Sequence, residues 1–133
     1  MKDPITCHIL DTHRGKPAAS VLVQLFTISS ITNDFNKIPF AQAKTDADGR
    51  VTSWTFDPDV NYNATGVLNG RWEKLVPGQY KMKFLTSKYF KEQGGETFFP
   101  YVEITFEVGE GKGDHYHIPL LLSNYSYTTY RGS

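Results

Sequence analysis

The feature that most constrains the fold of this chain is a series of short apolar alternations separated by turn residues. Successive side chains of a strand point to opposite faces of a sheet, so a period of two predicts strands rather than helices. Gly, Pro, Asn and Asp mark the ends of these segments. Strands are expected at residues 5–10, 21–26, 40–44, 77–85, 98–108, 115–122 and 128–130, with a further strand beginning near residue 50. The pattern is typical of an all-β protein.

One segment interrupts the strands with a helical pattern. Residues 86–95, TSKYFKEQGG, predict a short helix with Thr86 or Ser87 as N-cap and Gly94 near its C-terminus. The stretches 27–39 and 57–77 are polar or rich in Asn, Gly and Pro, and are expected to be loops. A length of 133 residues suits a single domain. The expected fold is an all-β, two-sheet sandwich with one short helix, covering residues 1–133.

Charge and cysteine content argue against several classes of partner and compartment. The chain has 14 basic and 14 acidic residues, so nothing indicates a nucleic acid or an anionic membrane as partner. Cys7 is the only cysteine, so an internal disulfide cannot form, which suits a reducing compartment. No apolar targeting region follows Met1, and no apolar run approaches the ~20 residues of a membrane span. We therefore expect a soluble protein of the cytoplasm or peroxisome that is not secreted.

Alternation places two histidines on strand faces opposite the core. In residues 5–10 the set of Ile and Cys side chains is expected inside, which turns His8 outward. In residues 115–122 the apolar set that alternates with the histidines is the better core candidate, which turns His117 outward. Pro119 lacks an N–H for the ladder, so this strand is expected at an edge or beside an interface.

A tight turn predicted from the sequence places an arginine at the start of a strand. The dipeptide Asp48–Gly49 predicts a turn, and Arg50 opens the strand that follows. A single histidine on a strand face is more often a surface or packing residue than a catalyst. The combination of His8 and His117 with Arg50 favours a site, although spacing alone does not prove that the three converge.

Several stretches of the chain resemble one family. The similarity is carried by "CHILDTHRGKPA", "TDADGRV", "GQYKMKF", "FFPYVEI" and "HYHIPLLLSNYSYTTYRGS". These resemble 5-hydroxyisourate hydrolases, the transthyretin-related enzymes of purine catabolism, over nearly the whole chain. The closing "YRGS" is the most specific element, since it separates these enzymes from the hormone-carrying transthyretins. The resemblance implies a prealbumin-like (transthyretin-like) sandwich, assembled as a homotetramer that is a dimer of dimers, with active sites in the channel between dimers.

The resemblance also implies a set of site residues. The family's catalytic histidines fall on His8 in "CHILD" and His117 in "HIPLL", and its arginine falls on Arg50 in "DGRV". The implied substrate-binding residues are Leu121, Tyr130, Arg131, Gly132 and Ser133. His115 shares the face of His117 but is expected to be a surface residue, and His13 is expected to be a solvated loop residue.

The implied reaction opens a ring amide of 5-hydroxyisourate to give 2-oxo-4-hydroxy-4-carboxy-5-ureidoimidazoline. Water is a poor nucleophile, and an imidazole with a pKa near ~6.5 can remove its proton and return one to the leaving nitrogen. Two close histidines would titrate as a coupled pair. Arg50 suits an oxyanion or the carbonyl edges of the substrate. The resemblance implies neither a metal nor a cofactor, and it assigns base and acid to neither histidine; the role of Ser133 stays open.

Three other interpretations remain. Nearby histidines suggest zinc, although no compact ligand spacing accompanies them. A transthyretin-like carrier would hold a small aromatic ligand in the same central channel, but positions 8, 50, 117 and the tail match the enzymes. In a purely structural sandwich the tyrosines near the C-terminus would be interface aromatics.

The segment 56–76 is longer than in most members of the family, and it could cover a channel mouth or add a subunit contact.

Overall fold

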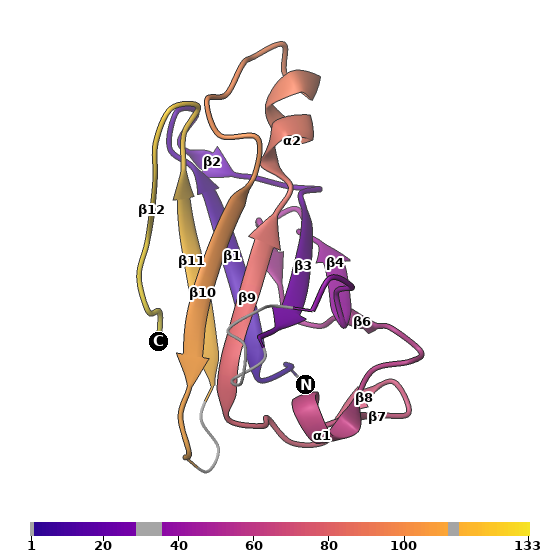
Figure 1. The fold of residues 1–133 in the computed structure, drawn as a ribbon. Helices are drawn as coiled ribbons and strands as arrows, with labels where there is room; N and C mark the ends of the chain where they lie inside the picture. Colours follow the sequence, from indigo (N-terminus) through magenta and orange to yellow (C-terminus); the bar gives the residue numbers. More distant parts are fainter. Residues whose placement is uncertain (1, 29–35, 112–114) are drawn as a thin grey trace.

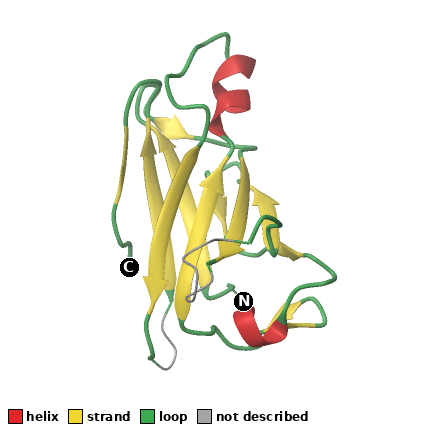
Figure 2. Ribbon diagram, in the orientation of Figure 1, coloured by secondary structure: helices red, strands yellow, loops and turns green. Residues whose placement is uncertain are grey.

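Two β-sheets packed face to face form the body of the molecule in this computed structural model, which describes residues 2–28, 36–111 and 115–133. Figures 1 and 2 show the two layers, with a helix at each end of the sandwich. The first sheet has the order β12-β11-β1-β2, and β5 also pairs with β1. Its strands are β1 (Ile5–Asp11), β2 (Lys16–Pro17), β5 (Arg50–Val51), β11 (Tyr116–Leu122) and β12 (Tyr127–Thr129).

The second sheet has the order β10-β9-β3-β4-β6. Its strands are β3 (Leu22–Thr27), β4 (Ala41–Lys44), β6 (Thr55–Phe56), β9 (Gly78–Phe84) and β10 (Val102–Val108). The predicted two-sheet sandwich is confirmed, and every longer strand lies within its predicted segment or one residue beyond it. The structure adds strands of only two residues, which are too short for a period of two to reveal. Part of the predicted loop 27–39 lies outside the described residues.

The core between the sheets determines which side chains lie on the outer face of the first sheet. The inward apolar side chains of β1 and β11 are all 6% exposed or less: Ile5, Cys7, Ile9, Tyr116, Ile118, Leu120 and Leu122. Burying one such side chain contributes roughly 1.5–3 kcal/mol. A slip of one residue would exchange the two faces of a strand, so this burial strongly specifies the register. The alternate residues of both strands are therefore held on the outside.

Pro119 predicts that strand β11 lies at an edge or beside an interface, and the first of these alternatives is wrong. It lies between β1 and the C-terminal strand β12. The pairing with β12 covers Leu120 to Leu122, and the next bridge joins His117 to Gly132. The carbonyl of His117 faces this tail, so the backbone of Pro119, two residues on, faces it too. The missing N–H of Pro119 therefore interrupts the short ladder with the tail and leaves the pairing with β1 intact.

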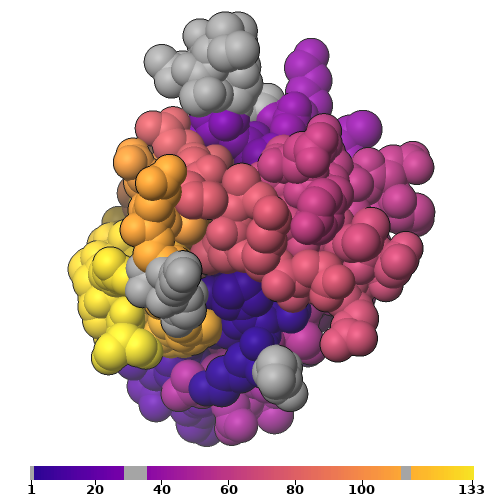
Figure 3. Space-filling model, turned by 90° about the horizontal axis from the view of Figure 1, so that it is seen from below, coloured from indigo at the N-terminus to yellow at the C-terminus, as the bar shows by residue number. Residues whose placement is uncertain are grey.

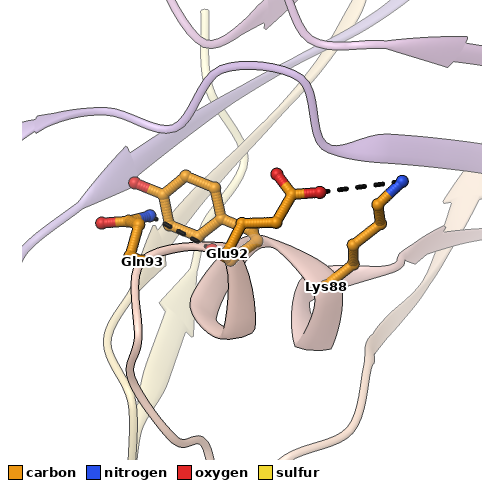
Figure 4. Close-up of polar contacts among 4 residues, drawn as sticks. Lys88, Glu92 and Gln93 are labelled. Carbon is orange, nitrogen blue, oxygen red and sulfur yellow. Dashed lines mark hydrogen bonds and ion pairs between the residues drawn. The ribbon is translucent and has the colours of Figure 1, made fainter.

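The predicted helix is present, but its cap is not the predicted one. Helix α2 (Thr86–Glu92) already includes Thr86, and its N-cap is Leu85, which makes no side-chain cap bond. Lys88 and Glu92 form an exposed ion pair at 3.7 Å on this helix, shown in Figure 4. Such a pair contributes only about 0.3–0.5 kcal/mol. Gly94 follows the helix with φ +73°, which agrees with the predicted C-terminal glycine.

The segment 57–77 is not the unstructured loop that was expected. It contains a second helix, α1 (Tyr62–Thr65), and a small two-stranded sheet of β7 (Val67–Leu68) and β8 (Arg71–Trp72). The side chain of Trp72 anchors it, because its Nε1 donates to the Thr65 carbonyl at 2.8 Å. Figures 1 and 3 both put this segment on the opposite side of the sandwich from the C-terminal tail.

The predicted turn before Arg50 connects the two sheets. It follows β4 of the second sheet and leads into β5, which pairs with β1 of the first. Gly49 has φ +74°, and a Cβ there would lie 2.5 Å from the carbonyl oxygen of Ile9. Both the left-handed backbone and the close approach to β1 therefore require glycine.

We expect Gly49→Ala to lower the free energy of unfolding by at least about 2 kcal/mol, because a Cβ adds a clash to a left-handed conformation that alone costs roughly 1–2 kcal/mol. Gly15→Ala is the matched control, since Gly15 has φ +69° but open space around it. Denaturant unfolding of both variants checks this. Equal losses would mean that contact with Ile9 contributes nothing.

Candidate active site

The parallel pairing of β1 with β11 brings two histidines to one face of the first sheet. In this register Thr6 is opposite His117, and His8 is opposite Pro119. Both His8 and His117 are half-buried and alternate with fully buried apolar residues, so they lie opposite the core as the alternation predicts. The register thus places neighbouring outward positions of two strands within reach of each other.

Arg50 joins this face from a third strand. Strand β5 pairs antiparallel with β1, which sets Arg50 opposite His8. The preceding turn is held by Asp46, whose Oδ1 accepts the backbone N–H groups of Asp48 and Arg50, each at 2.9 Å. The exposed guanidinium of Arg50 contributes to the lowered pKa of both His8 and His117. The three residues predicted from the sequence as catalytic therefore lie together.

The surroundings of both histidines lower their pKa and so favour the neutral form. Burial lowers the pKa of His8 below its ordinary value, and the positive charge of Arg50 lowers it further, while the backbone of Asp48 acts in the opposite direction. Burial is also the largest cause of the lowered pKa of His117. Electrostatic interactions with Arg50, His115, His8 and Lys2 lower it further, in that order. Neutral imidazoles are the form that can accept a proton.

The C-terminal tail packs against His117. The backbone N–H of Gly132 donates to the His117 carbonyl at 3.0 Å. A Cβ at Gly132 would lie 2.6 Å from Cδ2 of His117 and 3.0 Å from Cγ of Pro119, so only glycine allows this approach. Figure 3 shows the C-terminal segment, in yellow, along one side of the molecule at the end where the N-terminal segment, in indigo, is visible. The tail is thus part of the wall around the histidine.

A threonine that sequence reasoning missed connects two histidines. The hydroxyl of Thr6 lies 2.8 Å from Nδ1 of His117 and 3.0 Å from Nε2 of His115. Thr6 is only 2% exposed, whereas His115 is exposed as predicted. Alternation places Thr6 on the face of His8, and this is the one signal that could have found it. The pairing partner of its strand cannot be read from local sequence.

The other predicted substrate-binding residues lie beside this group or away from it. Leu121 is half-buried on the same strand face as His117, and Ser133 is exposed. Tyr130 is 57% exposed. The guanidinium of Arg131 lies over the ring of Tyr116, 4.7 Å from its centroid, and not against a histidine of the group. In a single subunit, Tyr130 and Ser133 therefore face solvent.

The donor set of the described residues suits acid–base chemistry better than metal binding. Within residues 2–28, 36–111 and 115–133, no group of three or more His, Cys, Asp or Glu side chains is arranged to hold a metal ion. Neutral imidazoles next to a fixed guanidinium can instead move a proton and stabilise a developing oxyanion.

No helix of the described chain is long and apolar enough to cross a membrane.

Comparison with known proteins gives consistent matches over nearly the full length. The sequence model of the HIUase/Transthyretin family matches residues 5–132. A probable 5-hydroxyisourate hydrolase of Schizosaccharomyces pombe is 41% identical over 129 residues, 97% of this chain and 90% of that protein. The solved 5-hydroxyisourate hydrolase of Klebsiella pneumoniae is 28% identical with a TM-score of 0.70, covering 97% of this chain and 92% of that one. Sea bream transthyretin in complex with thyroxine has a TM-score of 0.74 at 28% identity, covering 98% and 95% of the two chains.

Proposed function

The chain belongs to the HIUase/transthyretin family and has 5-hydroxyisourate hydrolase activity in urate degradation, and we propose that His8, Arg50 and His117 carry out this reaction. The observation that carries the proposal is the position of Arg50, whose charge acts on both histidines. Two strand faces and one turn, far apart in sequence, supply three groups with complementary chemistry to one place.

In the proposed mechanism a neutral imidazole activates water. The base removes a proton as water attacks the ring carbonyl, and a proton is returned to the leaving ring nitrogen, which opens the ring to 2-oxo-4-hydroxy-4-carboxy-5-ureidoimidazoline. Acid–base assistance of this kind contributes roughly 10²–10⁴-fold in rate. The guanidinium of Arg50 stabilises the oxyanion that forms at the carbonyl, since it offers positive charge and planar N–H donors. No step of this mechanism needs a metal or a cofactor.

We further propose that Leu121 and the tail residues Tyr130, Arg131, Gly132 and Ser133 bind the substrate. Support comes from the contact of the tail with His117, because Gly132 lies against its ring and carbonyl. Residues so close to the proposed base would also contact a substrate that the base serves. The exposure of Tyr130 and Ser133 leaves both side chains available for such contacts.

The proposed assembly is a homotetramer, a dimer of dimers, with sites at the dimer–dimer interface. The group of His8, Arg50 and His117 lies on the outer face of the first sheet. A depression of about 610 Å³ is present beside α2, but Leu85, Lys88 and Pro100 line it and none of the site residues does. A second copy facing the sheet would turn this open face into a channel wall.

Leu121→Asp tests the assembly, because it places a carboxylate on the half-buried outer face of β11. We expect this variant to lose the tetramer and at least 10²-fold in activity together, since a buried unpaired charge is strongly unfavourable. Sedimentation velocity and the hydrolysis assay on the same samples check this. A fully active dimer or monomer would contradict the proposed position of the site.

The activity is tested on freshly generated 5-hydroxyisourate. Its ultraviolet absorbance should decay faster with the protein than in a sample without protein, and the ureidoimidazoline should accumulate. Decay at the spontaneous rate would favour a carrier, because the fold is shared with sea bream transthyretin. Binding of a small aromatic ligand, measured by calorimetry, would then identify that function.

The pH dependence should follow the lowered pKa values. Because His8 and His117 have a pKa below 6.5, kcat/KM should fall only when the pH drops below that value, as the bases become protonated. Arg50→Gln removes a positive charge, so the pKa of both histidines should rise. Titration of their ring C–H signals by NMR measures this independently of activity. Arg71→Gln, on β8, is the control and should leave both pKa values unchanged.

We also propose that residues 1–133 form a single transthyretin-like domain that works in the cytoplasm or the peroxisome. Cys7 supports a reducing compartment, because it is the only cysteine and cannot form an internal disulfide. Fractionation of source cells, with the protein followed by antibody, tests the compartment. Recovery of the protein outside the cell would contradict it.

A further inference from the structure

The hydroxyl of Thr6 occupies a position between two imidazole rings. Its Oγ1 lies 2.8 Å from Nδ1 of His117 and 3.0 Å from Nε2 of His115, both within hydrogen-bond distance. The two rings are stacked at an angle of 21° with centroids 6.4 Å apart. Thr6 is 2% exposed, while His115 is open to solvent. A buried hydroxyl therefore joins a half-buried histidine of the site to an exposed one.

The single proton of this hydroxyl links the states of the two rings. A threonine hydroxyl donates one hydrogen bond and accepts up to two. When Thr6 accepts from Nδ1–H of His117, it can donate to a bare Nε2 of His115. When Thr6 donates to a bare Nδ1 of His117, it can accept from Nε2–H of His115. In either arrangement both rings carry their proton on the same type of nitrogen.

We propose that Thr6 and His115 form a proton path between His117 and solvent, a proposal that rests on the hydrolase site described above. Thr6 is a positioning residue in this path, since it orients the ring of His117 and couples the protonated nitrogen of His117 to that of His115. His115 is its outer end. The remaining ring nitrogen of His117, Nε2, is the one that exchanges protons with water and with the leaving group.

Every proton in the path is accounted for. When Nε2 of His117 takes a proton from the attacking water, the Nδ1–H bond of His117 breaks and an O–H bond forms at Thr6. The original hydroxyl proton passes to Nε2 of His115, and the Nδ1 proton of His115 leaves to solvent. After His117 gives its Nε2 proton to the leaving nitrogen, the reverse transfers restore the first state. His117 is uncharged at both stages.

The electrostatics of the site give this path its advantage. A base that acts alone becomes an imidazolium, and here that cation would form next to Arg50 in a partly buried position. The groups that face His117 from the neighbouring elements are Arg50 of β5, His8 of β1, Lys2 of the N-terminal segment and His115 of its own segment, and none of them is acidic. All four disfavour the charged ring, so a neutral exchange of protons avoids the least favourable species.

The path is tested first at Thr6. Thr6→Val keeps the shape and removes the hydroxyl, and it should lower kcat by about 10- to 100-fold with little change in KM, a part of the roughly 10²–10⁴-fold that acid–base catalysis supplies. Thr6→Ser should restore most of the lost rate. Thermal unfolding shows whether each variant is folded. A folded Thr6→Val protein with wild-type kcat would overturn the path.

The outer end is tested at His115, whose exposure makes loss of folding a minor concern. His115→Ala should lower kcat about tenfold in dilute buffer, and added imidazole should restore it, while the wild type should not respond. His13→Ala, at an exposed loop histidine, is the matched control and should match the wild type. If His115→Ala keeps the wild-type rate in dilute buffer, His115 is not part of the path.

NMR distinguishes the path from a purely structural role of Thr6. Nitrogen-15 shifts of the wild-type rings should give the same tautomer for His115 and His117. Protonation of Nδ1 in His117 together with Nε2 in His115 would mean that Thr6 only accepts, which would overturn the proposal. Failure of the function itself looks different, because wild-type protein would then not accelerate hydrolysis. An active wild type with an inactive His117→Ala and an unaffected Thr6→Val would reject the path alone.

Discussion

Replacement of His117 by alanine is expected to lower kcat by roughly 10²–10⁴-fold, the usual contribution of a general acid–base residue. Three separate observations of the site involve His117. Its Nδ1 contacts Thr6, its carbonyl accepts from Gly132, and Arg50 acts on its pKa. Within the described residues, no second side chain combines these three features.

The fold should survive this replacement. His117 is half-buried and lies outside the core, so its loss removes one hydrogen bond, worth about 0.5–1.5 kcal/mol. Steady-state kinetics on 5-hydroxyisourate, corrected for spontaneous decay, and thermal unfolding measure the two effects separately. His13→Ala controls for the loss of a histidine as such. A His117→Ala protein that retains more than a tenth of the wild-type kcat would remove His117 from the proposed catalytic group.

Gly132→Ala is expected to lower kcat/KM by about 10²-fold without a large change in stability. The new methyl group would meet Cδ2 of His117 at 2.6 Å, Cγ of Pro119 at 3.0 Å and the carbonyl oxygen of His117 at 3.2 Å. Real Cβ atoms do not approach that closely, so either the tail moves away or the ring turns. Displacement of a catalytic group by about 1 Å can cost about 10²-fold in rate.

Gly109→Ala is the matched control for this variant. Nothing lies closer than 4.0 Å to a Cβ at Gly109, so the change adds a methyl group without a clash. Kinetics and thermal unfolding should show a loss of activity for Gly132→Ala alone, with both proteins folded. Wild-type kinetics in Gly132→Ala would mean that the tail does not need its observed contact with His117.

Local patterns predicted the elements of the fold well where a periodic run is long. The strands β1, β9, β10 and β11 each have seven residues, and alternation finds all four. Apart from β5, which the turn at Asp48–Gly49 indicated, the two-residue strands were missed, and helix α1 was missed because a single turn carries no period. The predicted N-cap of α2 was wrong. Thr86 has a side chain suited to capping, but it lies fully buried within the first turn of the helix.

The site was predicted only in part, for a related reason. The turn at Asp48–Gly49 is a local signal, and it correctly presents Arg50. That this turn carries the chain from one sheet to the other depends on the buried approach of Gly49 to Ile9, which no local pattern contains. The resemblance to 5-hydroxyisourate hydrolases identified the tail, but it gave no reason for the glycine in it.

By itself the sequence determined which residues form the longer strands and, for β1 and β11, which side faces the core, because a period of two is a property of neighbouring residues. It therefore determined that His8 and His117 point away from the core. Only the tertiary structure decided that the outer faces of these two strands lie side by side, since Thr6 and His117 are 111 positions apart and contact through the parallel register of β1 and β11. That register follows from the burial of the opposite strand faces, which is a property of the whole sandwich.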